Sequence, residues 1–290
     1  MESVLTWLLE PLGFAFMLRG LAAVVIVGLV VPVLGSYVVL RGMAFFGDAL
    51  AHIILPGVVI AFLFGLPLAV GALVVGVLAA VAIGAISQRT HLREDTAIGV
   101  VFAGAFALGV ALISLQQSYA VDLAHILFGN LLGVSAADLW LMAGLGAVVV
   151  LTVIALYKEF LVLSFDPILA QTLQLPVGLL HNLMLVLLAV VIVISLQAVG
   201  VALVLAQLIT PAASAYLLTR RLPWMMITSA GIGVVCGLIG LYVSYYVNVA
   251  SGPAIVLVET LVFAIAFAIS RRWPRRQAPA PRPGREGSAA

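Results

Sequence analysis

Charged residues are scarce in this chain, and cysteine and lysine are almost absent. Only 8% of its 290 residues are Asp, Glu, Lys or Arg; the one cysteine is Cys236 and the one lysine is Lys158. A soluble domain carries about a quarter of its residues as charged types, so this composition excludes an ordinary soluble protein. A single cysteine excludes a disulfide framework and a cysteine-based metal centre. The net charge of +2 is small, and we expect no nucleic-acid partner.

Motifs for nucleotide binding and hydrolysis are also missing. The sequence has no G-x-x-x-x-G-K-[ST] phosphate loop, no H-E-x-x-H and no G-x-S-x-G. Those patterns hold ATP phosphates, a catalytic zinc ion and an acyl-transfer nucleophile, respectively. We therefore expect no enzymatic activity from this chain, and any ATP that drives it must be bound by another subunit.

Long apolar runs take the place of these features. Apolar residues make up 65% of the chain, and about 20 of them in a row cross a bilayer as a helix. The candidate spans are 17–40, 47–64, 68–87, 96–117, 137–156, 179–198, 200–219, 224–243 and 254–270. We predict an all-α polytopic membrane protein whose second helix is broken at Pro56-Gly57, because proline interrupts helical hydrogen bonding. Nine spans result, or eight if the first or second re-enters without crossing.

The basic residues indicate the orientation of these spans. If the C-terminus is cytoplasmic, nine spans place every arginine and lysine except Arg19 in cytoplasmic segments or the tail, as the positive-inside rule requires. We expect residues 1–14 to form an interfacial helix and residues 15–270 to form one membrane domain. Residues 271–290 are basic and rich in proline, and we expect a disordered tail.

The stretch Arg41–Gly57 places two ionisable side chains in an otherwise apolar run. Asp48 and His52 are four residues apart, so a helix brings them to one face, one turn apart. Pro56, a further turn on, has no N–H to bond the carbonyl of His52. Ionisable groups inside a membrane helix are costly and usually face a cavity or a pathway. The three groups predict a divalent-metal site; the alternative is a helix-capping aspartate and a structural core histidine.

A second distinctive segment, Ser164–Pro176, lies between two spans on the predicted cytoplasmic side. Asp166-Pro167 is typical of a capped helix start, and Pro176 ends the segment. Such a short amphipathic helix can dock on a cytosolic partner; the alternative is an ordinary interfacial helix. The residues assigned to this coupling role are Asp166, Pro167, Ala170, Leu173 and Pro176.

Several other polar residues lie in or beside the spans. Those assigned to the pathway are Gln207, Thr210, Ser214, Asn248 and Glu259. The first three form a stripe beside Pro211, which leaves the carbonyl of Gln207 without its helical partner just as Pro56 does for His52. Glu259 needs a partner or water within its span, either in the pathway or across an interface.

Four other ionisable residues have simpler interpretations. We predict that Asp95 caps the helix that begins near residue 96 and that His181 is interfacial. Asp122 and His125 belong to a solvated outer helix, with the reception of an incoming cation as the alternative.

The order of these motifs resembles the membrane permease of bacterial ABC importers for zinc, manganese and iron, from about residue 15 to 270. The similar elements are Gly47-Asp48-Ala49-Leu50-Ala51-His52 with Leu55-Pro56-Gly57, Glu94-Asp95-Thr96-Ala97-Ile98-Gly99, Phe128-Gly129-Asn130, Val199-Gly200 with Pro211-Ala212-Ala213-Ser214-Ala215, and Ser244-Tyr245-Tyr246 with Ser251-Gly252-Pro253. Each element is modest alone, and the set in this order is specific.

This resemblance implies a homodimer in the bacterial inner membrane. Two cytosolic ATP-binding subunits would dock on the segment Asp166–Pro176, and an extracytoplasmic metal-binding protein would deliver the ion. Asp48 and His52 would line the route, with no permanently bound cofactor and with ATP on the partner subunit. Among the departures from the family pattern, Gln174 replaces a usual glycine, which implies a slightly longer docking helix. Asn248 replaces a frequent aspartate, and Glu259 has no counterpart.

We therefore expect a permease that imports a first-row divalent metal by alternating access. Imidazole suits zinc and carboxylate also suits manganese, so the sequence places zinc first and manganese second. A gradient-coupled secondary carrier is the main alternative, and it would need no ATPase-docking segment. A membrane enzyme would need a further ligand beside Asp48 and His52.

Overall fold

The computed structural model describes residues 10–90, 92–115 and 131–272, and all of its regular elements there are helices. The elements are η1 (Glu10–Gly13), α2 (Ala15–Arg41), α3 (Phe45–Ile53), α4 (Leu55–Leu63), α5 (Leu68–Thr90), α6 (Glu94–Ser114), η2 (Leu131–Gly133), α8 (Ala136–Ala155), α9 (Tyr157–Phe165), α10 (Pro167–Thr172), α11 (Val177–Val199), α12 (Val201–Leu218), α13 (Leu222–Val247) and α14 (Ser251–Arg272). The predicted all-α fold class is confirmed.

Nine segments of the described chain are long and apolar enough to cross a membrane, if α3 and α4 count as one span of 19 residues. Their bounds lie within a few residues of those predicted. The short turn η1 and the end of α14 at Arg272 are the described parts of the two terminal segments; residues 1–9 and 273–290 lie outside the described residues.

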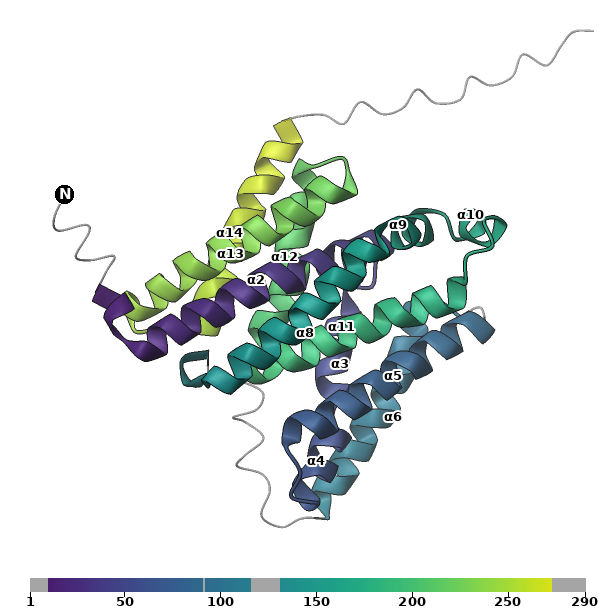
Figure 1. Ribbon diagram of the computed structural model, residues 1–290, viewed down its shortest axis with the longest axis horizontal. Coiled ribbons are helices and arrows are strands. Elements are labelled where there is room, and N and C mark those ends of the chain that lie inside the picture. The colour runs from purple at the N-terminus through teal and green to yellow at the C-terminus, as the bar shows by residue number, and fades with distance from the viewer. Residues whose placement is uncertain (1–9, 91, 116–130, 273–290) are drawn as a thin grey trace, which may run out of the picture.

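The long helix α2 forms the centre of the bundle and packs on α13, α12, α8 and α11 (Figure 1). Small residues allow a close crossing, because a Cβ atom added at Gly28 would lie 2.9 Å from the carbonyl carbon of Gly233 in α13. One turn away, the Ser229 hydroxyl donates to the carbonyl of Pro32 at 3.1 Å. Close backbones and interhelical hydroxyl bonds are how helices associate in lipid, where no hydrophobic force drives them together.

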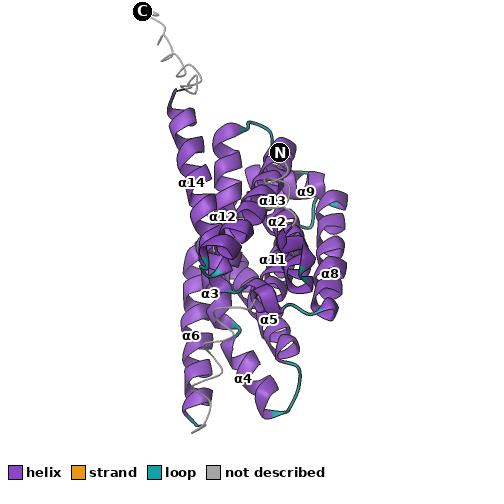
Figure 2. Cartoon of the chain, turned by 90° about the vertical axis from the view of Figure 1, so that its left-hand side faces the viewer, coloured by secondary structure: helices purple, strands orange, loops and turns teal. Residues whose placement is uncertain are grey.

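The second span is broken, as the sequence predicts. Ile54 is both the last cap of α3 and the first cap of α4, and Pro56 lies in the first turn of α4, where its missing N–H costs nothing. α4 is fixed against α5 at Gly57 and Gly71, since a Cβ atom on either would overlap the backbone of the other. Figure 2 shows α6 and α14 on one side of the molecule and α8 on the other.

Candidate functional site

α3 carries Asp48 and His52 one turn apart within the candidate span Phe45–Leu63. Both side chains are half-buried. Their immediate neighbours in the chain, Gly47, Ala49 and Ala51, are buried, so the two polar residues mark the partly exposed side of a helix that is otherwise packed. No hydrogen bond or ion pair joins the carboxylate of Asp48 to another described residue.

Aromatic rings from α6 surround the imidazole of His52. The ring centroids of Phe102 and Phe106 lie 5.9 and 5.7 Å from that of His52, both edge-on. Phe45, at the start of α3, meets Phe102 edge-on at 6.1 Å. The rings hold the imidazole in place by packing, and no side chain or backbone group in the described part of the chain bonds to its nitrogens.

The carbonyl of His52 is the third predicted group. Pro56 offers it no N–H, but the amide of Ile54 points toward both this carbonyl and that of Leu50, with a 3.2 Å hydrogen bond to the latter. The carbonyl of His52 is therefore approached by an amide and is not fully free. Its role as a ligand stays a prediction.

Asp48 and His52 are a pair, not a closed cage. Within the described residues no three side chains of the His, Cys, Asp or Glu type lie together in a way that could hold a metal ion. Two ligands leave coordination positions open, which suits an ion that must bind and leave. A catalytic or structural zinc site holds three or four protein ligands, so Asp48 and His52 alone do not form a site of that kind.

Two residues of the polar stripe on α12 make internal hydrogen bonds, although Oε1 of Gln207 is buried with no partner among the described residues. Gln207 is 1% exposed, and its side-chain amide donates to the carbonyl of Gly233 at 3.3 Å. The hydroxyl of Ser214 is fully buried and donates to the carbonyl of Thr210 at 2.8 Å. α12 meets α3 through leucines, since a Cβ atom on Gly47 would contact Leu205 and Leu208. The stripe is thus not brought together with Asp48 and His52.

The remaining two pathway residues lie elsewhere. Asn248 is exposed and ends α13 with a left-handed backbone at φ 55°. Glu259 is fully buried in α14, and neither of its carboxylate oxygens has a hydrogen-bond partner among the described residues. Their place in the pathway stays a prediction. Asp122, His125 and the element Phe128-Gly129-Asn130 lie outside the described residues.

A cluster of three ionisable residues was not predicted. Arg41, the last residue of α2, forms an ion pair with Glu94, the first residue of α6. The same guanidinium nitrogen lies 2.8 Å from Nδ1 of His181 in α11. The side chain of His181 is only 5% exposed, so it packs inside the bundle, and its interfacial depth stays a prediction. The predicted cap is wrong: Arg93 is the N-cap of α6, and Asp95 lies inside its first turn.

The predicted coupling segment forms the short helix α10. Oδ1 of Asp166 accepts from the amides of Ile168 and Leu169 at 3.0 and 2.9 Å, and Pro167 is the first helical residue. This is the expected cap. Ala170 is fully buried and faces the protein, so it does not belong to the outward face of α10. The residues that expose large apolar side chains there are Phe165, Ile168, Leu169 and Leu173.

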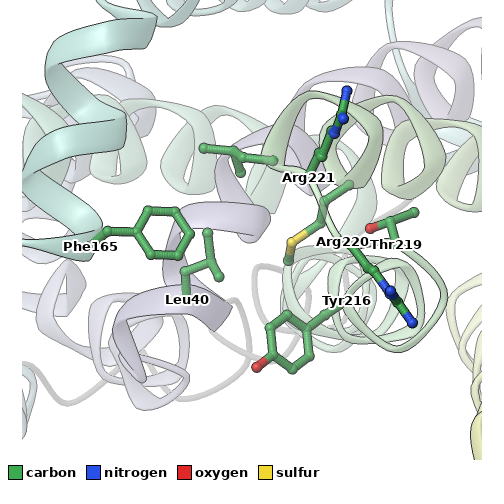
Figure 3. Close-up of a pocket in the computed structure, with 8 residues that line it drawn as sticks. Leu40, Phe165, Tyr216, Thr219, Arg220 and Arg221 are labelled. Atoms are coloured by element: carbon green, nitrogen blue, oxygen red, sulfur yellow. The ribbon is translucent and has the colours of Figure 1, made fainter. Parts of the chain in front are cut away.

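A pocket of about 400 Å³ lies between the ends of α2, α9 and α12 and the start of α13, and Phe165, two residues before α10, lines it. Figure 3 shows Leu40 and Phe165 on one side of it and Arg220 and Arg221 across from them. Neither arginine forms an ion pair with another described residue. The pocket combines an apolar wall with positive charge.

Comparison with known proteins decides the family. The model of the ABC 3 transport family matches residues 13–270 of this chain. The chain belongs to the ABC 3 transport family. That match includes α3, the Arg41–Glu94–His181 cluster and α10, so all the sites described above lie inside the family domain.

Two family members and one solved structure show how far the likeness extends. The chain is 47% identical over 261 residues to the manganese transport system membrane protein MntC of Halalkalibacterium halodurans, which covers 90% of this chain and 89% of that protein. It is 39% identical over 282 residues to the chelated iron transport system membrane protein YfeD of Yersinia pestis, with 96% and 95% covered. PsaBC from Streptococcus pneumoniae, solved in complex with Fab, superposes with a TM-score of 0.81 at 39% identity, covering 93% of this chain and 98% of that one.

One departure from the pattern of the ABC 3 transport family has a different outcome from the one expected. α10 does not continue through Gln174: it ends at Thr172, and Gln174 adopts the left-handed backbone with φ 55°. The amide of Leu175 bonds to the carbonyl of Ala170 at 3.1 Å, and that of Gln174 to Gln171 at 2.9 Å. These are the bonds of a Schellman helix end, so Gln174 fills the position that glycine favours.

Proposed function

We propose that this chain is the permease subunit of an ATP-driven importer that carries a divalent transition metal inward by alternating access. Metal binds in transit to the carboxylate of Asp48 and the imidazole of His52. The observation that carries the proposal is that the Asp48 carboxylate, on a half-exposed face inside a candidate membrane span, has no partner among the residues that the structure describes. Such a group is costly in lipid and is kept where a pathway needs it.

The same face argues for a homodimer. Around the pair, Phe45 is 44% exposed and Phe106 is 39% exposed, and α6 has the smallest buried share of the nine spans. A carboxylate that faced lipid tails here would pay the desolvation cost without compensation. A second copy of the chain covers this face in our proposal, so that the two α3 helices enclose a polar route between them.

Manganese is the cargo that we propose, ahead of zinc. The names of the relatives MntC and YfeD refer to manganese and to chelated iron. One carboxylate and one imidazole with open positions suit manganese and iron, whereas selection for zinc commonly adds thiolates or further histidines. The preference for zinc drawn from the sequence therefore gives way to manganese, with iron as the competing ion.

The cytoplasmic partner is an ATP-binding subunit that docks on α10. The exposed side chains of Ile168 and Leu173, 75% and 56% accessible, offer an apolar contact, and the adjoining pocket offers Arg220 and Arg221 to acidic side chains. On the outside, a metal-binding protein delivers the ion. The importer lies in the bacterial inner membrane.

Uptake measurements test the cargo and the energy source together. The permease is expressed with its ATP-binding subunit and binding protein in a strain without its own manganese, zinc and iron transporters, and metal content is measured with the ions in competition. We expect manganese to accumulate and uptake to depend on the ATPase. Uptake that persists without the ATPase and collapses with an uncoupler would favour the secondary carrier instead.

The docking surface has its own test. Ile168→Asp places a charge on the exposed apolar face of α10 and should abolish co-purification of the ATP-binding subunit. Gln171→Asp adds the same charge at an exposed polar position of the same helix and should leave the complex intact. Retention of the ATPase by Ile168→Asp would remove α10 from the proposed interface.

A further inference from the structure

The predicted cytoplasmic ends of α2, α6 and α11 meet at the cluster Arg41–Glu94–His181. One guanidinium nitrogen of Arg41 contacts both Oε1 of Glu94 and Nδ1 of His181. These two acceptor atoms lie 3.6 Å apart. The side chains of Arg41, Glu94 and His181 are 12%, 25% and 5% exposed.

The hydrogen-bond chemistry fixes what the two acceptors present. A guanidinium group can only donate, so Nδ1 of His181 must accept, and its lone pair points at the cation. Oε1 of Glu94 points at the same cation. The cluster therefore consists of an imidazole nitrogen and a carboxylate oxygen that converge on one positive charge, which in this conformation belongs to Arg41.

The spacing of the two acceptors fits a metal ion as well. Two ligands held at about 2.1 Å from a first-row ion lie roughly 3.0–3.4 Å from each other in octahedral or tetrahedral geometry. The observed 3.6 Å is within a small side-chain movement of that range. Oε2 of Glu94 is buried and has no hydrogen-bond partner within the described ranges of the chain, so a second carboxylate oxygen is available for coordination.

The position of the cluster relates it to the first pair. Glu94 lies eight residues before Phe102 on α6, which is about 12 Å along the helix toward the cytoplasm, and Phe102 contacts His52. Arg41 precedes Asp48 by seven residues through the short α2–α3 connection. A carboxylate and an imidazole, the ligand types of Asp48 and His52, thus occur again closer to the predicted cytoplasmic side. They lie on α6 and α11, which also pack on α3.

We propose that Glu94 and His181 form a second, release-side binding pair for the divalent metal, and that Arg41 occupies this pair until the metal displaces it. The inference rests on the proposed function, because the ion must reach the pair from Asp48 and His52. When no metal is present, the guanidinium of Arg41 lies between the two ligands. A divalent ion that enters the pair takes the place of this monovalent group. Arg41 then returns once the ion has left for the cytoplasm.

A cadmium-binding experiment tests the pair without transport. The full chain is purified in lipid nanodiscs with Cys236→Ala, which removes its one native thiol, and with Asp48→Ala and His52→Ala, which remove the first pair. His181→Cys is then combined with Arg41→Met and titrated with Cd²⁺. We expect the ultraviolet charge-transfer band of a cadmium–thiolate bond at one ion per chain, and its loss on adding Glu94→Gln.

The matched control moves the thiol by one residue. Asn182 accepts from the amide of Gln88 at 3.1 Å and so faces α5 instead of Glu94. Asn182→Cys, in the same background, should give no tight cadmium band. An equal band in both variants, or none with His181→Cys, would overturn the proposal.

A second measurement keeps Arg41 in place, in case its replacement prevents folding. His181→Gln retains an acceptor for Arg41, whereas His181→Cys supplies a metal ligand. In the complete importer we expect His181→Gln to lower manganese uptake at least tenfold while the ATPase still co-purifies, and His181→Cys to shift the preference from manganese toward zinc and cadmium. Normal uptake by His181→Gln would show that His181 only anchors Arg41.

The two proposals fail in different ways. If Asp48→Ala leaves uptake unchanged, the proposed function fails whatever the cadmium result. If uptake depends on Asp48 but the His181→Cys chain gives no cadmium band and His181→Gln transports normally, the second pair alone fails.

Discussion

α3 and α12 carry polar side chains at the same spacing next to a proline, yet the structure uses them in opposite ways. On α12, Thr210 and Ser214 are four residues apart and share a hydrogen bond, and the helix runs unbroken through Pro211. On α3, Asp48 and His52 are also four residues apart, but they share no bond, and the helix stops at Ile53, before Pro56. A proline beside a polar stripe therefore does not by itself mark a pathway.

The difference lies in which groups are satisfied within the chain. A serine hydroxyl can bond the carbonyl one turn back and then pack among apolar neighbours. An aspartate has no donor to offer the backbone and needs a cation, water or several N–H groups. For the pairs Asp48–His52 and Thr210–Ser214, the presence or absence of a bond within the chain thus marks the difference between the two helices. The experiments below test this difference.

The largest difference in metal uptake is expected between loss of the Asp48 carboxylate and loss of the Ser214 hydroxyl. Asp48→Ala should lower metal uptake by at least roughly 100-fold, since loss of even an outer hydrogen-bond partner of a metal ligand can cost that factor. Ser214→Ala removes a hydroxyl that already has its partner and should retain most uptake. Both are measured as metal accumulation with the ATPase co-purifying. Equal loss of uptake in the two variants would contradict the distinction between the polar residues of α3 and those of α12.

The second contrast concerns the packing that fixes the broken span. Gly57→Ala places a methyl group against the backbone at Gly71 and should destabilise the permease by about 2–3 kcal/mol. Gly144→Ala in α8 meets nothing within 4 Å and should stabilise its helix by up to about 1 kcal/mol. Thermal unfolding of the purified protein measures both. A stable Gly57→Ala variant would mean that α4 and α5 can move apart at no cost.

The third contrast exchanges the prolines. Pro56→Ala supplies an amide that can bond the carbonyl of His52 and join α3 to α4, so uptake should fall roughly tenfold, equivalent to about 1.4 kcal/mol. Pro211→Ala lies in a helix that is already continuous and should change uptake by less than about twofold, below 0.5 kcal/mol. The manganese uptake rates of the two variants, each compared with the unchanged protein, measure this difference. Full activity of Pro56→Ala would show that the break itself is dispensable.

The smallest effect is expected at the end of α10, where the backbone is strained although its bonds are made. Gln174→Gly relieves a left-handed residue and should stabilise the protein by about 1 kcal/mol. Gln171→Gly inside α10 should destabilise it by about the same amount. Opposite shifts in the midpoint of thermal unfolding would confirm the Schellman end, and shifts of the same sign would contradict it.

Periodic features were predictable from the sequence alone. Apolar run lengths determine the spans, the Asp166-Pro167 pair determines the start of α10, and the i, i+4 spacing places Asp48 and His52 on one face. Each depends on contacts within a few residues, where helix geometry is fixed in advance. The break at Ile54 follows from Pro56 for the same reason.

Long-range contacts were not predictable in this way. Arg41 and His181 are 140 positions apart, and Arg41 and Glu94 are 53 apart. Local chemistry alone favoured a helix cap near Glu94 and an interfacial histidine. The signal that could have found the cluster is that all three residues lie at the same predicted end of their spans. Gln174 was misjudged for a local reason, because a non-glycine residue can occupy the left-handed position when the surrounding bonds compensate.

The single residue Gly42 separates Arg41 from the segment that leads into α3. Its backbone is left-handed, at φ 71° and ψ 22°, and a Cβ atom there would meet nothing within 4 Å. A side chain at this position would have room but would be held in a left-handed conformation that only glycine adopts without cost, so Gly42 allows the sharp end of α2 just before α3. Only residues 42–44 separate Arg41 from the helix that carries Asp48, so the two proposed binding pairs are joined by a short piece of backbone as well as by packing.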